Sequence, residues 1–492
     1  MLVHSNIFCT FAVEIITNKT HNMEQTTYNN RPAIEQDMEW YGKELERLMN
    51  DYPCLREVCK GLEPAAYPAA LFVAACFMGT LMTRCTYRFY DSLRGLCRLN
   101  YDVHIIGDPG SGKSFAVRLY DLLAAPIIRV SKEGMNAMNR YKRKYSEWEQ
   151  GGQKGDGPTK PKALIRTHPA RTSNKVFIED MNNAVDLVEG EEMHLHMLSF
   201  DTELDNTIRN QGAAWNNKMY MELKAFHNEE DGECYISDNL YPSFNVYWNA
   251  VYTGTPMALD AKVNQRNIGN GLSTRIAAIP MPSTHFRMMK YEKLGEASQE
   301  PEEDKVLRMW AERLDKEYGE LPIKKLVDEC YDWTARRMAD AKDDESKADE
   351  LMCKRVAYYG INVSVPFILM RHWDEWKQHR TLTIDDTDLY FCQLVCNIQL
   401  RCQRHFFGRL WESYFILDKI PAGKANMHAK HYSQKMKLRY RRLDNDFSTT
   451  DVMERCEVSK RNAEKMVERW KNEGYIRKIE NMWYRKILLE LM

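Results

Sequence analysis

The segment Gly107-Asp108-Pro109-Gly110-Ser111-Gly112-Lys113-Ser114 fits the spacing GxxxxGK[ST]. Glycines let the backbone wrap closely enough for its N–H groups to face phosphate oxygens, and a following helix adds its positive amino-terminal end. In this pattern the lysine reaches the β- and γ-phosphates, and the last hydroxyl ligates Mg²⁺. The segment predicts a site for ATP and Mg²⁺ made by these eight residues and Phe115, with Lys113 also catalytic.

The residues on either side of this loop favour the same interpretation over a plain glycine-rich turn. A short apolar run, Tyr101–Ile106, precedes it and predicts a strand, and Phe115–Leu123 is compatible with a helix. Further strand-like runs alternate with helical stretches, which predicts an α/β P-loop NTPase core over residues 101–290. These runs are Ala163–Arg166, His194–Phe200, Phe244–Thr253 and Arg275–Pro280.

Hydrolysis also needs an acid on a neighbouring strand. The apolar run that begins at His194 ends in Asp201 and Glu203, so Asp201 is the predicted Mg²⁺ acid and Glu203 the residue that polarises water. A rival pair, Glu179-Asp180, lies in a stretch with the pattern of an amphipathic helix. The alternative that both acids merely end a solvated strand stays open.

Two later positions are candidates for contacts with the transferred phosphate. Asn249 and Thr253 lie in a strand-like run that ends in small polar residues, where a hydroxyl or amide can hold the attacking water; a simple strand-to-turn junction is the alternative. Arg275 follows a glycine-containing segment and is a candidate arginine finger, in cis or from a neighbouring subunit. An ordinary surface arginine is the alternative for that residue.

In this order, the segments resemble a P-loop family that is carried on bacterial mobile elements and is described as primase/helicase-like, a domain without a settled function. The resemblance spans about 100–410 and implies a RecA/AAA+-like ATPase core, with Asp201 and Glu203 as Walker-B-type acids and Arg275 in a turn of the family's type. The residues that carry it are Gly107–Ser114, Phe200–Asp205, Leu223–Glu229, Thr253–Pro256, Asn270–Arg275 and Phe406–Gly408. A zinc finger and an acidic polymerase constellation are not evident in the sequence, so primase chemistry is not expected.

Composition narrows the class of protein. The 492 residues are too many for one core and suggest roughly three domains. A hydrophobic share of 44% argues against a disordered chain, and a net charge of −1 excludes a uniformly basic, nucleic-acid-coating protein. The 13 cysteines are odd in number and form no CxxC, which is typical of a reducing cytoplasm. Glu14 interrupts the apolar patch Ile7–Ile16, so no signal peptide is predicted.

The pattern of polar and apolar stretches predicts the domain boundaries. Residues 1–38 are expected to be a poorly ordered extension, 39–100 helical, 131–162 an exposed insertion, 301–418 a helical domain and 420–443 a basic connector. The uncharged run Ala65–Met82 contains Pro68 and Gly79 and is rich in alanine, which favours a buried core helix over a membrane span.

Residues 444–492 predict a C-terminal winged helix-turn-helix. Ser448 can cap a short helix, Ser459 a longer one that reaches Asn472, and two short strands are expected at Tyr475–Glu480 and Met482–Ile487. Arg461, Lys465 and Arg469 lie at i, i+4 and i+8 of the second helix and can contact nucleic-acid phosphates. Because acidic residues flank this stripe, docking of another protein is the alternative.

These predictions combine into two functional hypotheses. The leading one is an ATP-driven, helicase-like motor that acts on DNA for a mobile element and assembles as a homo-oligomer. In a hexameric ring, Arg275 would contact the nucleotide site of the neighbouring subunit. The other is a nucleotide-switched DNA-binding regulator with little turnover. Cys392, Cys396, Cys402 and His405 are interpreted as core residues rather than zinc ligands.

Overall fold

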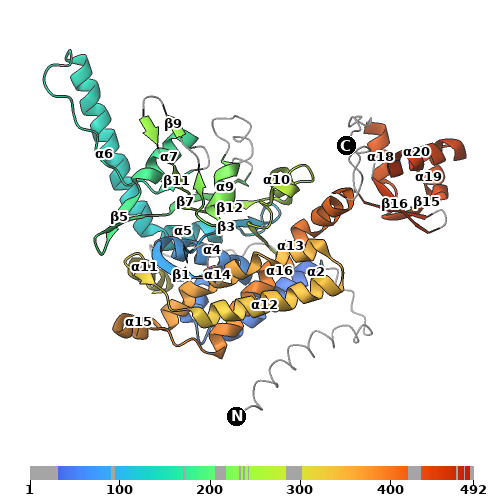
Figure 1. Ribbon diagram of the computed structural model, residues 1–492, viewed down its shortest axis with the longest axis horizontal. Coiled ribbons are helices and arrows are strands. Elements are labelled where there is room, and N and C mark those ends of the chain that lie inside the picture. The colour runs from blue at the N-terminus through green and yellow to red at the C-terminus, as the bar shows by residue number, and fades with distance from the viewer. Residues whose placement is uncertain are drawn as a thin grey trace, which may run out of the picture.

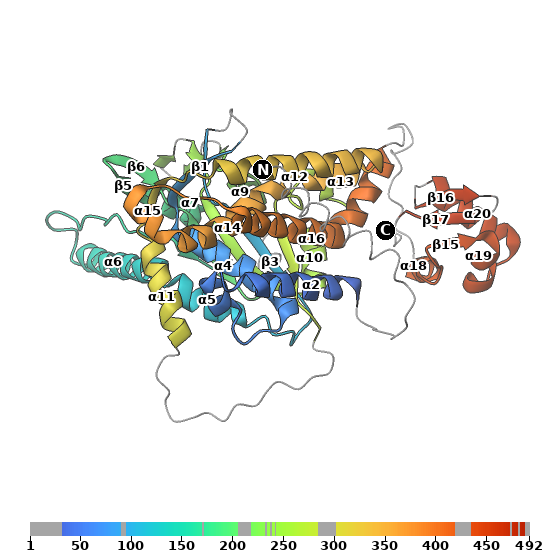
Figure 2. The same cartoon turned by 90° about the horizontal axis from the view of Figure 1, so that it is seen from below.

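The computed structural model describes residues 32–89, 95–169, 172–204, 218–231, 234–236, 239–241, 243–283, 302–418, 434–472, 475–480 and 483–487. In Figures 1 and 2 a large α/β body carries a smaller C-terminal unit, drawn in red, beside it. Residues 1–31 of the predicted extension and most of the basic connector lie outside the described residues.

A five-stranded, all-parallel sheet forms the centre of the large body. Its strands lie in the order β13-β3-β12-β7-β4. The register pairs Ile106, the last residue of β3, with both Gly254 and Pro280, so three strands end at the same edge. The strand bounds are β3 (Asp102–Ile106), β4 (Thr167–His168), β7 (Met197–Asp201), β12 (Trp248–Gly254) and β13 (Ala277–Pro280).

Helix α4 (Tyr67–Leu81) packs against β3, β12 and β13. Every residue from Pro68 to Leu81 is buried, and the small alanines allow neighbouring segments to pack closely against this helix. One close approach is at Gly79, where a Cβ would lie 2.3 Å from the Tyr101 ring. The segment Pro64–Leu81 is long and apolar enough to cross a membrane, but 89% of it is buried within the protein. The prediction of a buried core helix is therefore confirmed.

The other helices surround this sheet and helix α4. In chain order they are α2 (Ala33–Leu48), α3 (Pro53–Cys59), η1 (Pro64–Ala66), α5 (Phe115–Leu123), α6 (Ala125–Gln150), α7 (Asn174–Asn183), α9 (Met219–Ala225), α10 (Pro256–Lys262), η3 (Ile268–Asn270), α11 (Glu302–Leu314), α12 (Lys324–Asp343), α13 (Lys347–Cys353), α14 (Val356–Arg371), α15 (Trp373–His379) and α16 (Asp386–Asp418). Helix α6 projects away from the rest in both views.

Small sheets complete the large body. One has the order β14-β1-β2 and joins the amino-terminal region to the region after residue 302, because β14 runs parallel to β1. The strands of the small sheets are β1 (Arg84–Arg88), β2 (Leu96–Cys97), β5 (Val185–Val188), β6 (Glu191–His194), β8 (Glu230–Asp231), β9 (Cys234–Ile236), β10 (Asn239–Tyr241), β11 (Phe244–Asn245) and β14 (Tyr318–Glu320).

One hydrophobic core extends through the whole large body. A single cluster of buried residues runs from Ile34 to Trp411 and includes side chains of the amino-terminal helices, the sheet and the helices after residue 302. The predicted boundaries near residues 100 and 301 therefore do not separate independent cores. Helix α2 begins at Ala33 and buries Ile34 and Met38, so the predicted boundary at residue 38 is also too late.

The C-terminal unit has a core of its own. Its elements are α18 (Gln434–Arg441), β15 (Asp446–Ser448), α19 (Thr449–Cys456), α20 (Lys460–Asn472), β16 (Ile476–Glu480) and β17 (Trp483–Lys486). The strands form an antiparallel sheet in the order β15-β17-β16. Ser448 caps α19 in a reciprocal capping box with Asp451, as its sequence position predicts. Trp470, Tyr440 and Phe447 lie at the centre of this second core.

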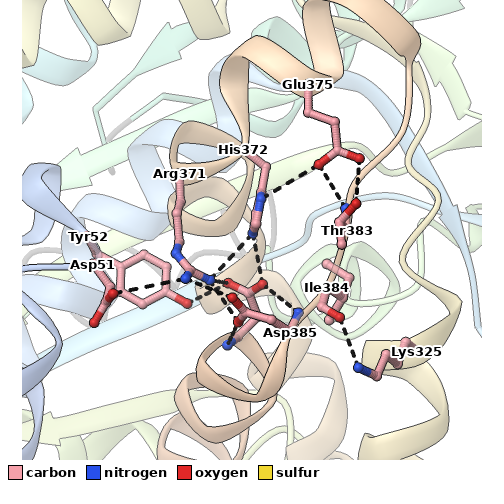
Figure 3. A network of polar contacts seen from close by, with 10 residues as sticks. Asp51, Tyr52, Lys325, Arg371, His372, Glu375, Thr383, Ile384 and Asp385 are labelled. Carbon is pink, nitrogen blue, oxygen red and sulfur yellow. Dashed lines mark hydrogen bonds and ion pairs between the residues drawn. The ribbon is translucent and has the colours of Figure 1, made fainter.

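A polar network ties the amino-terminal helices to α14, α15 and α16 (Figure 3). At its centre the fully buried carboxylate of Asp388 accepts hydrogen bonds from the Tyr52 hydroxyl at 2.6 Å and from Arg371 at 2.9 Å. His372 Nε2 lies 2.9 Å from the other oxygen of Asp388. Asp385 completes the network with a hydrogen bond of 2.8 Å from Arg371. The buried charge is thus matched from several elements.

This network predicts a loss of stability in acid. Hydrogen bonding to the Arg371 guanidinium holds the pKa of Asp385 well below its ordinary value. A carboxyl group with a depressed folded-state pKa stabilises the fold above its unfolded pKa of about 3.9, and that contribution is lost as the pH falls further. We expect the urea midpoint to fall more steeply for the native chain than for Asp385→Asn between about pH 5 and pH 3. Asp332→Asn, an exposed change on α12, should retain the native pH dependence.

Candidate functional site

The loop between β3 and α5 has the backbone that a phosphate cradle needs. Gly110 and Gly112 take φ values of 80° and 81°, which side chains other than glycine rarely adopt. A Cβ on Gly107 would lie 2.6 Å from Ser111 Oγ, so glycine is also required at the start of the loop. Helix α5 then begins at Phe115, with Ser114 at its N-cap position. The loop therefore presents its backbone at a helix amino terminus.

Lys113 folds back over this loop. Its Nζ donates hydrogen bonds of 2.7 Å to the carbonyl oxygens of Gly107 and Asp108, and a longer one to Ser111 Oγ. Partial burial lowers the pKa of Lys113 below its ordinary value, while the carboxylates of Asp108 and Glu203 act in the opposite direction. The ammonium group is thus held at the loop and within electrostatic range of a predicted catalytic acid.

Asp201 and Glu203 lie at the carboxyl end of β7. Asp201 is the last residue of that strand, and its Oδ1 accepts a hydrogen bond of 3.0 Å from the backbone N–H of Glu203. Strand β7 is not the direct neighbour of β3, because β12 lies between them and separates their axes by about 10 Å. The rival acids Glu179 and Asp180 lie on helix α7, as predicted.

Strand β12 connects the loop to the acidic strand end. The backbone N–H of Gly107 donates to the carbonyl oxygen of Gly254 at 3.1 Å, just beyond Thr253. The buried hydroxyl of Thr253 donates to the carbonyl oxygen of Thr202 at 2.8 Å, between Asp201 and Glu203. The structure thus brings Thr253, Asp201, Glu203 and Lys113 to one edge of the sheet.

Asn249 does not join this group, which corrects its assignment as a phosphate sensor. It lies near the amino end of β12, about 16 Å along the strand from Gly254. Its side chain is fully buried and bonds the Thr80 hydroxyl, the Leu99 carbonyl and the Tyr101 N–H. Asn249 therefore holds α4 and the chain before β3 against the sheet.

Arg275 also lies away from the loop. It precedes β13, whose first residue pairs with Val103 near the amino end of β3, so it sits at the opposite edge of the sheet. Its Nη1 donates to the Gly271 carbonyl at 3.1 Å, and its own carbonyl accepts from the Tyr359 hydroxyl at 2.7 Å. The cis form of the arginine-finger prediction is therefore wrong for this conformation, and only the form acting on a neighbouring subunit stays a prediction.

A hollow of about 260 Å³ adjoins the loop at Gly107 and Asp108. Its walls come from α2, from the chain after β13 and from α16, and they are mostly apolar. Ile34, Met38, Met281, His405 and Phe406 line it. Sequence reasoning missed this hollow because its walls come from segments hundreds of residues apart. Of its lining residues, Gly107, Asp108, Pro256 and Phe406 belong to segments that carried the family resemblance. A larger hollow, of about 660 Å³, is lined by residues of α2 and α3 and contains none of the predicted site residues.

The basic stripe of the C-terminal unit is exposed and borders a groove. Arg461, Lys465 and Arg469 all lie on the outer face of α20. A groove of about 280 Å³ between α18 and α20 is lined by Lys465 and Arg469, and also by Arg439 of α18. Arg439 belongs to the predicted basic connector, so folding adds a third cation to this surface. Carboxylates are absent from the residues that line the groove in the described part of the unit.

Three buried thiols come together inside the helical region. Cys330 of α12 lies 3.4 Å from Cys392 of α16, and Cys396 completes the group, with all three sulfur atoms within 4.8 Å of one another. All three cysteines are buried. Cys402 and His405 are not part of this group. The sequence pattern suggested Cys392 and Cys396 together but gave no sign of Cys330.

No family model matches the chain, and no curated protein shows significant similarity to it. Inferences about function therefore rest on the residues and geometry described above.

Proposed function

We propose that this protein is an ATP-dependent, helicase-like motor that acts on DNA, as expected from its resemblance to proteins of mobile elements. The observation that carries the proposal is that Lys113 and Glu203 lie at the same carboxyl edge of a parallel sheet, beside a glycine-built loop. In open α/β sheets, ligands bind at this edge. A P-loop NTPase of the RecA/AAA+ class needs a phosphate-binding lysine and a water-polarising acid in such proximity.

The residues at this edge fit ATP and Mg²⁺. Gly110 and Gly112 turn the backbone of the loop, and Lys113 can exchange its bonds to loop carbonyls for bonds to phosphate oxygens. Ser114 and Asp201 are the residues that would hold Mg²⁺, which supplies positive charge where negative charge develops during phosphoryl transfer. Glu203 would orient and deprotonate water, and Thr253 fixes the chain that carries both acids. The hollow beside Gly107 offers an apolar surface for a nucleobase.

The C-terminal unit supports action on DNA. The order α18-β15-α19-α20-β16-β17, with an antiparallel sheet, is compatible with the predicted winged helix, in which α20 would be the recognition helix. Lys465, Arg469 and Arg439 offer positive charge along one groove. Positive charge of this kind binds phosphates without reading sequence.

ATP hydrolysis by the full chain, with and without single-stranded and duplex DNA, tests the proposal. We expect Mg²⁺-dependent hydrolysis that DNA stimulates, together with separation of a forked duplex. Glu203→Gln should lower kcat by about 10²–10⁴-fold, because it removes a general base but leaves the phosphate-binding loop intact. Glu191→Gln, an exposed change on β6, is the matched control and should retain native turnover.

Two other results would each contradict the motor. Nucleotide binding without turnover, combined with a DNA affinity that depends on the bound nucleotide, would establish the alternative of a nucleotide-switched regulator. A chain that binds no nucleotide at all would exclude both hypotheses.

A further inference from the structure

Helix α6 extends far beyond the body that carries its first turns. It has 26 residues and a length of about 39 Å, and its buried residues all lie between Pro126 and Gly134. The remaining part, residues 135–150, is here called the arm. In Figures 1 and 2 the arm points away from the central sheet. A helix that does not pack against the rest of the protein is rarely stable by itself. A function for the arm must therefore come from the residues on its surface.

The base of the arm is rigidly attached. Ser131 Oγ accepts hydrogen bonds from the backbone N–H groups of Arg166 and Thr167 at 3.0 and 3.2 Å. A Cβ on Gly134 would lie 2.5 Å from the Leu164 carbonyl oxygen, so only glycine allows the returning chain to pack here. Arg129 forms an ion pair of 2.8 Å with Glu312 of α11. These contacts fix the direction in which the arm leaves the body.

The surface of the arm combines positive charge with aromatic rings. No acidic residue occurs between Gly134 and Ser146, whereas Arg140, Lys142, Arg143 and Lys144 are all exposed. Within the part of the chain that the structure describes, these four side chains form neither a hydrogen bond nor an ion pair with a carboxylate. By contrast, Arg455 and Arg485 of the C-terminal unit are paired with aspartates. Glu147 and Glu149 near its end are the acids of the arm, so its four cations leave it a net positive charge that another molecule can bind.

The aromatic residues form a stripe between these cations. Tyr141, Tyr145 and Trp148 lie at i, i+4 and i+7, and their neighbouring ring centroids are 5.9 and 5.6 Å apart. At 100° per residue, Arg140 and Lys144 fall on one side of this stripe, Lys142 on the other, and Arg143 on the opposite face of the helix. The Trp148 indole N–H donates to the Gly155 carbonyl at 3.1 Å, which holds the end of the stripe under the following loop. Tyr145 stays 39% exposed, so its ring can accept a stacking base.

We propose that the arm binds single-stranded nucleic acid, with Arg140, Lys142, Arg143 and Lys144 on the phosphates and Tyr145 against a base. Cations beside aromatic rings are the combination that binds single strands without sequence preference, because every base has a π-face. A protein partner with an acidic surface would use the cations but would not need the exposed ring.

The position of the arm also couples it to the nucleotide site. Helix α5 begins at the phosphate-binding loop and ends at Leu123, and α6 begins at Ala125. The buried Ala124 is the only residue between them, and it bonds both helices through Tyr120 O and Ile128 N. A shift of α5 on nucleotide binding would therefore reach the first turn of α6 and, against the contacts at its base, change the setting of the arm. This coupling rests on the proposed function, whereas strand binding by the arm does not require it.

The test compares binding of the full chain to a fluorescein-labelled oligothymidylate by anisotropy across a salt series. Changing Arg140, Lys142, Arg143 and Lys144 together to Gln should weaken binding at least about tenfold and reduce the slope of log K against log salt by about 3. Tyr145→Ala should weaken it about fivefold or more with an unchanged slope. The matched control changes Lys60, Lys324, Lys342 and Lys347 to Gln, which removes the same charge from other exposed sites and should leave affinity within about twofold.

Hydrolysis of ATP without DNA should be unchanged in both arm variants, which shows that they fold, while stimulation by single strands should be lost. Full binding and a native salt slope in the quadruple arm variant would overturn the proposal. If Lys465→Gln/Arg469→Gln weakens DNA binding in the same assay, the proposed function still stands. Equal losses in the arm variant and the control variant would also overturn it. Loss of strand binding in the arm variant of a chain that hydrolyses no ATP would support the arm and refute the motor.

Discussion

Replacing Lys113 with alanine is expected to reduce ATP hydrolysis to background, a loss of at least about a hundredfold. The ammonium group of Lys113 lies over the loop that Gly110 and Gly112 shape, and no other lysine or arginine occurs between Gly107 and Val117. Without it, the charge that develops on the transferred phosphate loses its nearest positive partner. Steady-state hydrolysis measures the loss, and a fluorescent ATP analogue measures nucleotide affinity in parallel.

The structure provides a control for this variant. Lys342 is an exposed lysine near the end of α12, and Lys342→Ala should hydrolyse ATP at the native rate. Lys113 is only partly buried, and among the described residues its ammonium group bonds only its own loop, so its removal should not unfold the protein. Native turnover by Lys113→Ala would show that hydrolysis takes place at another site and would refute the assignment of the loop.

The largest effect on stability is expected for Asp388→Ala, which should lower the free energy of unfolding of the large body by about 3–5 kcal/mol. Asp388 is fully buried and accepts hydrogen bonds from Tyr52 and Arg371, with His372 beside it. Its removal leaves the guanidinium of Arg371 with the more exposed carboxylates of Asp385 and Asp51 and frees a buried phenol. Urea unfolding followed by circular dichroism measures the change in midpoint.

The separate core of the C-terminal unit supplies an internal control for Asp388→Ala. Hydrogen exchange should accelerate in peptides of α3, α14 and α16, while the peptides around Trp470 keep their native protection. Asp332→Ala removes an exposed carboxylate from α12 and should cost less than about 0.5 kcal/mol. An Asp388→Ala chain as stable as the native protein would mean that the network does not stabilise the fold.

Some of the site followed from local sequence because local physics decides it. The strand Asp102–Ile106, the glycine loop and the helix Phe115–Leu123 are contiguous, and the predicted helix has the bounds that the structure shows. The same holds for Ser448, whose hydroxyl can reach only the first turn of α19. The buried face of α20 likewise follows from local spacing, because Ala463, Met466, Val467 and Trp470 lie at i, i+3, i+4 and i+7.

Predictions that depended on strand ends were less reliable. The strand expected at Ala163–Arg166 is β4 at Thr167–His168; the Arg166 carbonyl accepts from Leu198 of β7, but the Arg166 N–H donates to Ser131 Oγ of α6 instead of to a strand. Asn249 and Thr253 looked equivalent in one apolar run, yet they lie at opposite ends of β12. A period of two residues identifies the faces of a strand but does not say which end of it meets a ligand.

The sequence alone therefore determined the glycine loop after β3, the helix that follows it and the cationic face of α20, since each depends on residues within a few positions of one another. Only the tertiary structure decided that β12 lies between β3 and β7, that Glu203 and Lys113 share one edge of the sheet, and that Arg275 lies at the opposite edge. Strand order arises from the burial of whole elements against α4 and α16, to which residues from all parts of the large body contribute.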